Sequence, residues 1–194
     1  MSNECIHTHA GILSRQLRLS VAQPQAKICV WESSDATGAI NFHDLPVARE
    51  LSTESAGWIV KYDAGLVEKL HQARIEALPN ETGGSILGVT DLKTKTIVVV
   101  DVLPTPPDSQ SSPNHFIRGQ ECQAEALENV HKRTAGVVDY VGEWHSHPDG
   151  CPARPSNDDE KLLNTLQHKM SAEGLPALMI IVAQTDVGLF IRYS

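Results

Sequence analysis

The sequence has few basic residues for its length. Its 194 residues include 16 Lys and Arg against 24 Asp and Glu, which gives a net charge of −8 at pH 7. Because phosphate binding needs clustered Lys and Arg, this balance argues against DNA or RNA as a partner. It leaves room for a partner with basic patches. The 41% hydrophobic fraction is typical of a globular chain that buries a core.

Cysteine pairs and long apolar runs are also missing. Cys5, Cys29, Cys122 and Cys151 are scattered and form no C-x-x-C pair, so neither a disulfide framework nor a thiolate zinc knuckle is indicated. We expect free thiols in a reducing cytoplasm. No apolar run approaches the ~20 residues of a membrane span. The start, MSNECIHTHAG, lacks the apolar region of a signal peptide. We therefore expect a cytoplasmic protein that does not bind membranes.

Helical and strand patterns alternate from Tyr62 onward. The first helix places Leu66, Leu70, Ile75 and Leu78 at near-helical spacing. Strands are predicted over residues 85–90, 96–103, 137–147, 177–184 and 188–193, and further helices over 119–134 and 156–170. This alternation predicts an α/β domain over residues 61–194, with a mixed β-sheet flanked by helices. Residues 1–60 favour a small β-rich extension of unclear role, with residues 32–44 as a loop.

The strand over residues 137–147 ends in an H-x-H pair. Side chains alternate along a strand, so Val141, Glu143, His145 and His147 are predicted to share one face. Two imidazoles at a strand end can bind one metal ion. Alone, however, an H-x-H pair is more often not a ligand pair.

The next helix begins with Ser156, a good N-cap, with an acid three residues on. Each helical residue turns about 100°, which sets Asp159 in the middle of the inward stripe and Asp158 at its edge. The stripe consists of Leu162, Leu163, Leu166 and Met170. Asp159 should therefore point towards the histidines, although a Ser-x-x-Asp at a helix start is most often only a cap. Two His, one Asp and a water make the open tetrahedral arrangement of catalytic zinc.

Other metal motifs fail on details. Zinc nucleobase deaminases need H-x-E and P-C-x-x-C, which are missing. His145, His147 and Asp149 form the H-x-H-x-D of metallo-β-lactamase-like hydrolases, but Gly150 stands where those proteins continue with His. No H-E-x-x-H occurs. We interpret the N-terminal His7-Thr8-His9 as part of a flexible tail. The residues alone do not identify a general base.

Two blocks resemble a known family. His145-Ser146-His147-Pro148, followed by Ser156-Asn157-Asp158-Asp159, resembles the JAMM signature H-[ST]-H-P…S-x-x-D of the JAB/MPN+ metallopeptidases, and GEWHSHP looks like the bacterial members. Upstream, residues 81–88 (ETGGSILG) look like the family's E-x-G-G-x-L-x-G segment. Two blocks in the right order are more specific than one. The resemblance covers residues 62–194 and implies the JAB/MPN fold, which is cytidine-deaminase-like.

The resemblance also implies roles for these residues. It places Zn²⁺ on His145, His147 and Asp159, and it makes Glu81 the general base and Ser156 a group that stabilises the oxyanion. Ser146 is expected to be structural, and Trp144, on the opposite strand face, to lie in the core.

Two alternatives stay open within the site. The gap between His147 and the Ser-x-x-Asp block is one residue longer than in many members, and the shorter spacing would select Asp158 in place of Asp159. Glu143 shares the histidine face and is the rival base. It lies about 7 Å along the strand from His145, at ~3.4 Å per residue.

Family members cleave peptide or isopeptide bonds after the C-terminal tail of ubiquitin or a ubiquitin-like protein. Bacterial relatives act on sulfur-carrier proteins or work with E1- and E2-like enzymes, some of them in antiphage systems. The resemblance therefore implies a zinc metallopeptidase, deubiquitinase-like, whose partner is a ubiquitin-like protein or its conjugate. The alternatives are a non-catalytic binding module of the same fold and a zinc hydrolase of a small molecule. Residues 104–118 form a long loop, either a plain connector or a cover for a substrate groove.

Overall fold

The structure, a computed structural model, describes residues 28–33, 40–45 and 49–193. The chain divides into two compact units, residues 1–49 and 50–194. In the first unit, β1 (Ile28–Ser33) pairs antiparallel with β2 (Ile40–Leu45). The prediction of a loop over residues 32–44 is therefore wrong, because β2 begins inside it. His7 and His9 lie outside the described residues.

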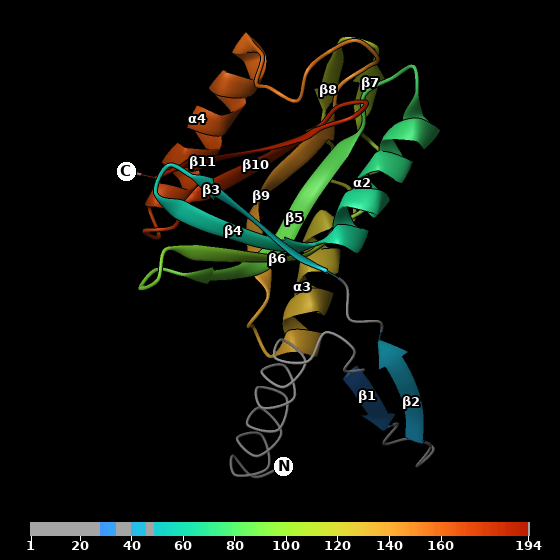
Figure 1. The fold of residues 1–194 in the computed structure, drawn as a ribbon, viewed down its shortest axis with the longest axis vertical. Helices are drawn as coiled ribbons and strands as arrows, with labels where there is room; N and C mark the ends of the chain where they lie inside the picture. The colour runs from blue at the N-terminus through green and yellow to red at the C-terminus, as the bar shows by residue number, and fades with distance from the viewer. Residues whose placement is uncertain (1–27, 34–39, 46–48, 194) are drawn as a thin grey trace. The chain divides into compact units, whose positions relative to one another are not determined.

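A mixed sheet forms the centre of the second unit (Figure 1). Its seven strands in the described residues run in the order β11-β10-β9-β5-β6-β4-β3, where β10 is parallel to β9, β4 is parallel to β6, and the other neighbours are antiparallel. The strands are β3 (Glu50–Ser55), β4 (Trp58–Asp63), β5 (Gly83–Asp91), β6 (Thr96–Val102), β9 (Asp139–Ser146), β10 (Ala177–Val182) and β11 (Val187–Arg192). The helices are α2 (Ala64–Ala77), α3 (Gln123–Thr134) and α4 (Asn157–Ser171). This architecture confirms the predicted α/β fold.

Strands β3 and β4 belong to the same sheet, although they lie largely in residues that the sequence assigned to the extension. The division into an extension of residues 1–60 and a JAB-like domain of residues 61–194 stays a prediction.

The two faces of the sheet carry separate hydrophobic clusters, which follow from strand alternation. On β10, Leu178, Ile180 and Val182 pack in the cluster of α2, whereas Ala177, Met179 and Ile181 pack in the cluster of α4. All six residues of β10 are buried, as expected for a central strand covered on both faces. Helices α2 and α4 lie on opposite sides of the sheet (Figure 1). No helix within the described ranges is long and apolar enough to cross a membrane.

The inward stripe of α2 differs from its prediction. Leu66, Leu70 and Arg74, spaced four residues apart, are the buried residues of this helix. Ile75, predicted to share the stripe, is 57% exposed. A spacing of four keeps side chains in one row along a helix, and here the third position of that row is an arginine.

Strand β9 is irregular beside its glycine. In the pairing with β5, Gly142 is opposite Ile86 and Tyr140 is opposite Leu87, so Val141 has no partner of its own. Gly142 has φ +155°, and a Cβ there would lie 1.8 Å from the Leu178 carbonyl oxygen. This bulge rotates Val141 into the core cluster of α2. The prediction that Val141 shares the face of Glu143 and His145 is therefore wrong.

The segment 104–118, predicted as a loop, contains a short hairpin. Strand β7 (Gln110–Ser112) pairs antiparallel with β8 (His115–Ile117). Outside the sheet, Cys122 and Cys151 are free thiols. The segment thus contains ordered secondary structure.

Candidate active site

Strand pairing brings the two sequence blocks together. In the antiparallel register of β5 and β9, Gly83 is opposite His145. The ladder continues one step further, since Ser146 N–H donates to the Thr82 carbonyl (2.7 Å) and Thr82 N–H donates to Ser146 Oγ (3.0 Å). Carried on once more, this register sets Glu81 opposite His147. Opposite residues in a ladder share a face, so Glu81 and both histidines point to the same side. Ser146 is 1% exposed and has the structural role expected of it.

Gly83 explains why this corner needs a glycine. A Cβ at this position would lie 2.4 Å from the Trp144 carbonyl oxygen and 2.6 Å from the ring of Phe116. The hairpin of β7 and β8 therefore packs directly against the backbone here. Ser112, on the same hairpin, accepts a hydrogen bond from Glu81 N–H (2.9 Å). The hairpin thus holds the backbone of Glu81 in place.

Three predicted ligands meet between β9 and the start of α4. Asp159 Oδ1 lies 3.0 Å from His145 Nε2, and Asp159 Oδ2 lies 3.4 Å from His147 Nε2. One ligand atom from each of the three residues lies within 4.8 Å of the others, and the imidazole centroids are 5.2 Å apart. Two imidazole nitrogens and one carboxylate oxygen suit zinc.

The histidines are oriented as metal ligands require. Nδ1 of His147 lies 2.8 Å from the Pro152 carbonyl oxygen. Because a carbonyl only accepts, Nδ1 carries a proton, and Nε2, which faces Asp159, is the nitrogen that can bind a metal once it is deprotonated. Nε2 of His145 is buried and has no partner of hydrogen-bond geometry within residues 49–193. A buried polar atom without a partner is rare, and a metal ion between these groups would satisfy it.

Asp159 is held by the start of α4. Ser156 Oγ accepts from Asp159 N–H (3.2 Å), and Asp159 Oδ2 accepts from Ser156 N–H (2.7 Å), a reciprocal capping box. Burial opposes ionisation of Asp159, but the close imidazoles of His145 and His147 outweigh it and hold the pKa of Asp159 far below its usual range. The hydrogen bond with Asp159 raises the pKa of His147 despite its burial. A carboxylate that stays ionised is the form that binds metals.

The adjacent acid points elsewhere. The Asp158 side chain is 72% exposed and binds Lys161 (2.7 Å), whereas the Asp159 side chain is 14% exposed. Leu163, Leu166 and Met170 are the buried residues of α4, close to the predicted stripe. The structure therefore brings Asp159, and not the carboxylate of Asp158, into the group with the histidines.

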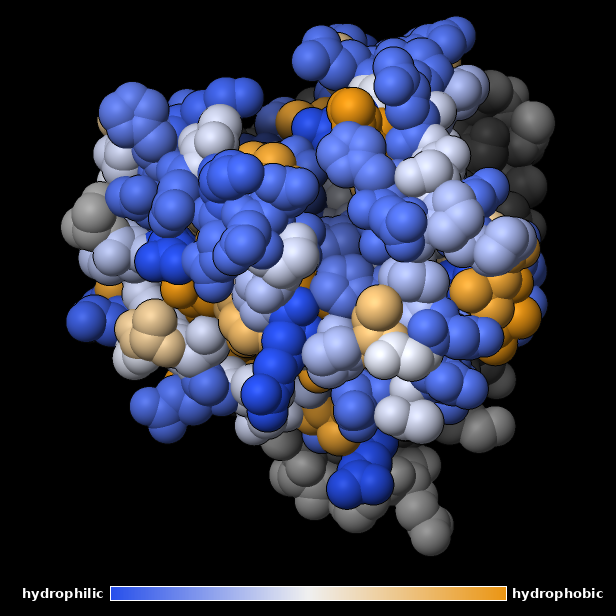
Figure 2. All heavy atoms as spheres, turned by 90° about the horizontal axis from the view of Figure 1, so that it is seen from above, coloured by the Kyte–Doolittle hydropathy of each residue, from blue (hydrophilic) through white to orange (hydrophobic). Residues whose placement is uncertain are grey.

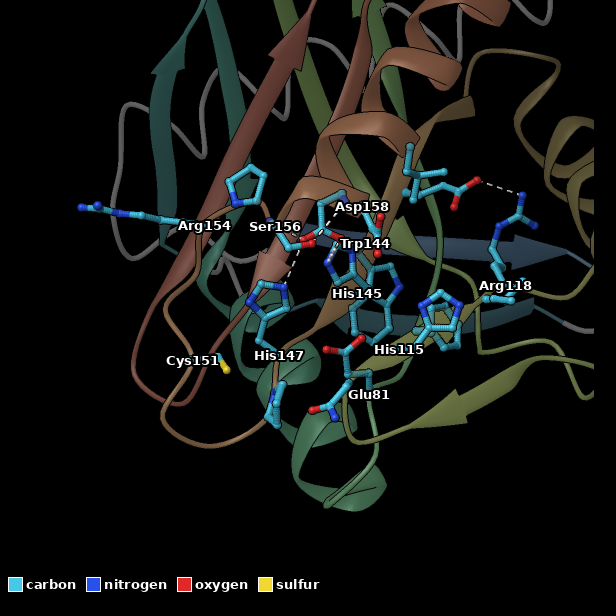
Figure 3. A pocket seen from close by; sticks show the side chains of 18 of the residues that line it. Glu81, His115, Arg118, Trp144, His145, His147, Cys151, Arg154, Ser156 and Asp158 are labelled. Atoms are coloured by element: carbon cyan, nitrogen blue, oxygen red, sulfur yellow. Dashed lines mark hydrogen bonds and ion pairs between the residues drawn. The ribbon is translucent and has the colours of Figure 1, made fainter.

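Glu81 lines a pocket of about 650 Å³ together with His145, His147, Ser156 and Asp159. Its side chain points towards the two imidazoles (Figure 3). Burial, the largest contribution, raises the pKa of Glu81 although the neighbouring histidines lower it. A carboxylate with a raised pKa is a better proton acceptor near neutral pH. From the end where α4 and the hairpin lie, the surface is mostly hydrophilic (Figure 2).

The rival base Glu143 is engaged in another interaction. Its Oε1 accepts from Arg118 Nη2–H (3.0 Å) and from the Tyr140 hydroxyl (3.2 Å). Arg118 follows β8, so this ion pair also fastens the hairpin to β9. Glu143 lines the same pocket, but its carboxylate forms an ion pair with Arg118. Trp144, on the opposite strand face, lies in the core cluster of α2, as expected from alternation.

The buried Arg74 lies near the site and is not predicted by the sequence. Arg74 donates through Nε to the His147 carbonyl oxygen (2.7 Å) and through Nη2 to Asp149 Oδ1 (2.5 Å). The contact occupies the carboxylate of Asp149, the third member of the H-x-H-x-D alternative, which lies outside the metal-ligand group. The sequence signal for Arg74 is its spacing, because it follows the buried Leu70 by four residues and the buried Leu66 by eight.

Comparison with known proteins gives a consistent family. The family described as prokaryotic homologs of the JAB domain matches residues 63–192. A curated protein named CD-NTase/cGAS isopeptidase, from Enterobacter hormaechei, is 30% identical over 139 residues, which cover 72% of this chain and 75% of that protein. A probable metalloprotease of Sinorhizobium fredii is 26% identical over 103 residues, 53% of this chain and 62% of that protein. A solved structure from Desulfitobacterium hafniense has a TM-score of 0.46 at 25% identity and covers 69% of this chain and 88% of its own.

Proposed function

The chain belongs to the family of prokaryotic homologs of the JAB domain and is a hydrolase of that type, and from this premise we propose that it is a zinc-dependent isopeptidase of the JAMM type. The bond that it hydrolyses is the peptide or isopeptide bond after the C-terminus of a ubiquitin-like protein. One observation carries the proposal: His145, His147 and Asp159 converge beside Glu81 in one pocket.

The residues of the site divide the work. His145 and His147 would each hold zinc through Nε2, and Asp159 through a carboxylate oxygen. When bound, zinc supplies a Lewis acid that activates water and polarises the scissile carbonyl. Glu81 accepts a proton from the attacking water and donates one to the leaving amine. Its raised pKa suits both directions of this transfer.

Ser156 would donate its hydroxyl hydrogen to the oxyanion that forms on the scissile carbonyl. The capping box uses a lone pair of Ser156 Oγ, as acceptor from Asp159 N–H. A hydroxyl has one donor hydrogen and two acceptor lone pairs, so the cap leaves the hydrogen available for substrate.

The substrate class rests on the Enterobacter relative. Its name describes an isopeptidase of CD-NTase or cGAS, which supports a protein conjugate as substrate of this chain too. We infer that the partners are a ubiquitin-like protein or its conjugate and the E1-like or E2-like proteins that build it.

Purified protein should contain about one zinc ion per chain and should cleave a ubiquitin-like protein fused or conjugated at its C-terminus. Zinc content is measured by elemental analysis, and cleavage by mass spectrometry of linear and isopeptide-linked substrates. A folded, metal-free and inactive protein would instead indicate the binding module. Bound zinc with cleavage of small substrates alone would indicate the small-molecule hydrolase.

The two roles of Ser156 can be separated by substitution. Ser156→Gly should lower kcat on the order of 10²-fold, because an oxyanion donor is lost. Glycine is itself an acceptable N-cap, so the free energy of unfolding should fall by only a few tenths of a kcal/mol. Steady-state kinetics and urea unfolding of the same preparation measure both. Full activity in Ser156→Gly would leave Ser156 with its capping role alone.

A further inference from the structure

Arg74 is a nearly buried cation close to the site. It is 2% exposed and occupies the third position of the inward row of α2, after Leu66 and Leu70. A buried charge is tolerated only when it is paired and hydrogen-bonded. Its partners therefore identify what it stabilises, and both lie in the turn that follows β9.

The contact of Arg74 with the His147 carbonyl oxygen is the more buried of the two. The Nε–H···O distance is 2.7 Å, and the bond is buried. The second partner, Asp149, has a side chain that is 63% exposed, where solvent weakens an ion pair. We expect the bond to the backbone of His147 to account for most of the effect of Arg74.

His147 is fixed at three points. Its N–H donates to the Val182 carbonyl oxygen (2.8 Å), its carbonyl accepts from Arg74, and its ring contacts the Pro152 carbonyl oxygen. Residues 148–152 form the turn that leads from the second point to the third. A shift at the carbonyl of His147 would therefore move the acceptor that orients its own imidazole.

Arg74 is also connected to Glu81 through the backbone. Its helix ends at Ala77, and the chain then reaches Glu81 through three residues, of which Asn80 donates to the Ala77 carbonyl oxygen (3.0 Å). The side chain of Arg74 thus links α2, the helix that precedes Glu81, to the turn that carries His147. The strand ladder makes a similar connection, because Ser146 N–H donates to the Thr82 carbonyl oxygen and Ser146 Oγ accepts from Thr82 N–H.

We propose that Arg74 is a positioning residue, which holds the His147 turn against α2 and so keeps His147 Nε2 and Glu81 in register for metal binding and proton transfer. The inference rests on the proposed function in taking His147 as a zinc ligand. Arginine suits this place because its planar fork can bond a carbonyl and a carboxylate at once, which lysine cannot do in the same geometry.

Zinc affinity of the Arg74→Met variant tests the proposal. Competition with a chromophoric chelator should show binding about 10–100-fold weaker than wild type, the range for groups that orient a metal ligand. Lys69→Met is the matched control, because Lys69 lies on the same helix in an exposed pair with Asp101, and its affinity should stay close to that of wild type. Asp149→Asn should also stay close to wild type. A folded Arg74→Met protein with wild-type affinity would overturn the proposal.

A second measurement does not depend on the metal. In zinc-free protein, hydrogen exchange of the amides in residues 147–154 should be faster in Arg74→Met than in wild type, while β10 and β11 exchange as before. Unchanged exchange in the turn would refute the positioning role. If wild type binds no zinc, the proposed function fails, and the exchange result still decides the role of Arg74. If Arg74→Met does not fold, Arg74→Lys is assayed in both ways, and wild-type behaviour there would count against the fork geometry.

Discussion

Glu81→Gln should abolish most of the cleavage of a ubiquitin-like fusion while the protein keeps its zinc. The loss expected for a general base is about 10²–10⁴-fold in kcat. Glutamine has nearly the same shape, and the backbone N–H at this position still reaches Ser112, so the fold should not change. Zinc should remain because the three groups that converge do not include Glu81. Single-turnover kinetics and metal analysis on the same sample measure both.

Glu143→Gln is the matched control, since it removes the other carboxylate of the histidine face. Glutamine can still accept from Arg118 and Tyr140, the two partners of Glu143. We therefore expect most of the activity to remain. An equal collapse in both variants, or full activity in Glu81→Gln, would show that Glu81 is not the base. Loss of zinc from Glu81→Gln would point to a ligand role in place of proton transfer.

The residues of the candidate site that the sequence predicts by their own periodicity, His145 and Asp159, lie in regular elements. Strand alternation put His145 and Trp144 on opposite faces, and the register of β9 with β10 confirms it, since their partners Ile181 and Ile180 belong to different clusters. Helical rotation alone predicts that Asp159, and not Asp158, faces inward. Both predictions depend on a single element and its period.

What the sequence did not predict depends on contacts between elements. The bulge at Val141 arises because Gly142 lies against the backbone of β10, and no period within β9 shows this approach. The apolar pattern predicts Ile75 and not Arg74 in the inward row, because the burial of an arginine can be explained only from its partners in other elements. The position of Glu81 opposite His147 follows only from extending the β5–β9 register by two residues, so the sequence points to Glu81 through the resemblance to the JAMM family alone.

This register explains how a base so far along the chain can serve the histidines. Opposite residues of an antiparallel ladder need no fixed spacing in sequence, and extending the register two residues beyond the Gly83–His145 pair sets Glu81 opposite His147. Glu81 follows directly after the turn that ends α2, and His147 directly after the end of β9. Both side chains thus lie where the strands leave the sheet and a substrate can approach.

Asp159→Ala and Asp158→Ala should separate the adjacent acids by their zinc content. Asp159→Ala removes one of three ligands, and we expect its affinity to fall by more than about 100-fold, beyond the range for outer-shell partners. Asp158→Ala removes only an exposed pair with Lys161, which solvent screens, and should bind zinc as wild type does. Chelator competition measures both affinities.

The capping box makes folding a necessary control for Asp159. Its Oδ2 accepts from Ser156 N–H, so alanine also removes half of the box, at a cost of roughly 1 kcal/mol in the free energy of unfolding. Asp159→Asn keeps an oxygen for that bond but loses the charge that a zinc ligand needs. Weak zinc binding in Asp159→Asn with near-normal stability would therefore assign the loss to ligation. Zinc loss in Asp158→Ala, with Asp159→Ala unaffected, would instead support the shorter spacing found in many JAMM proteins and refute the helical-face argument.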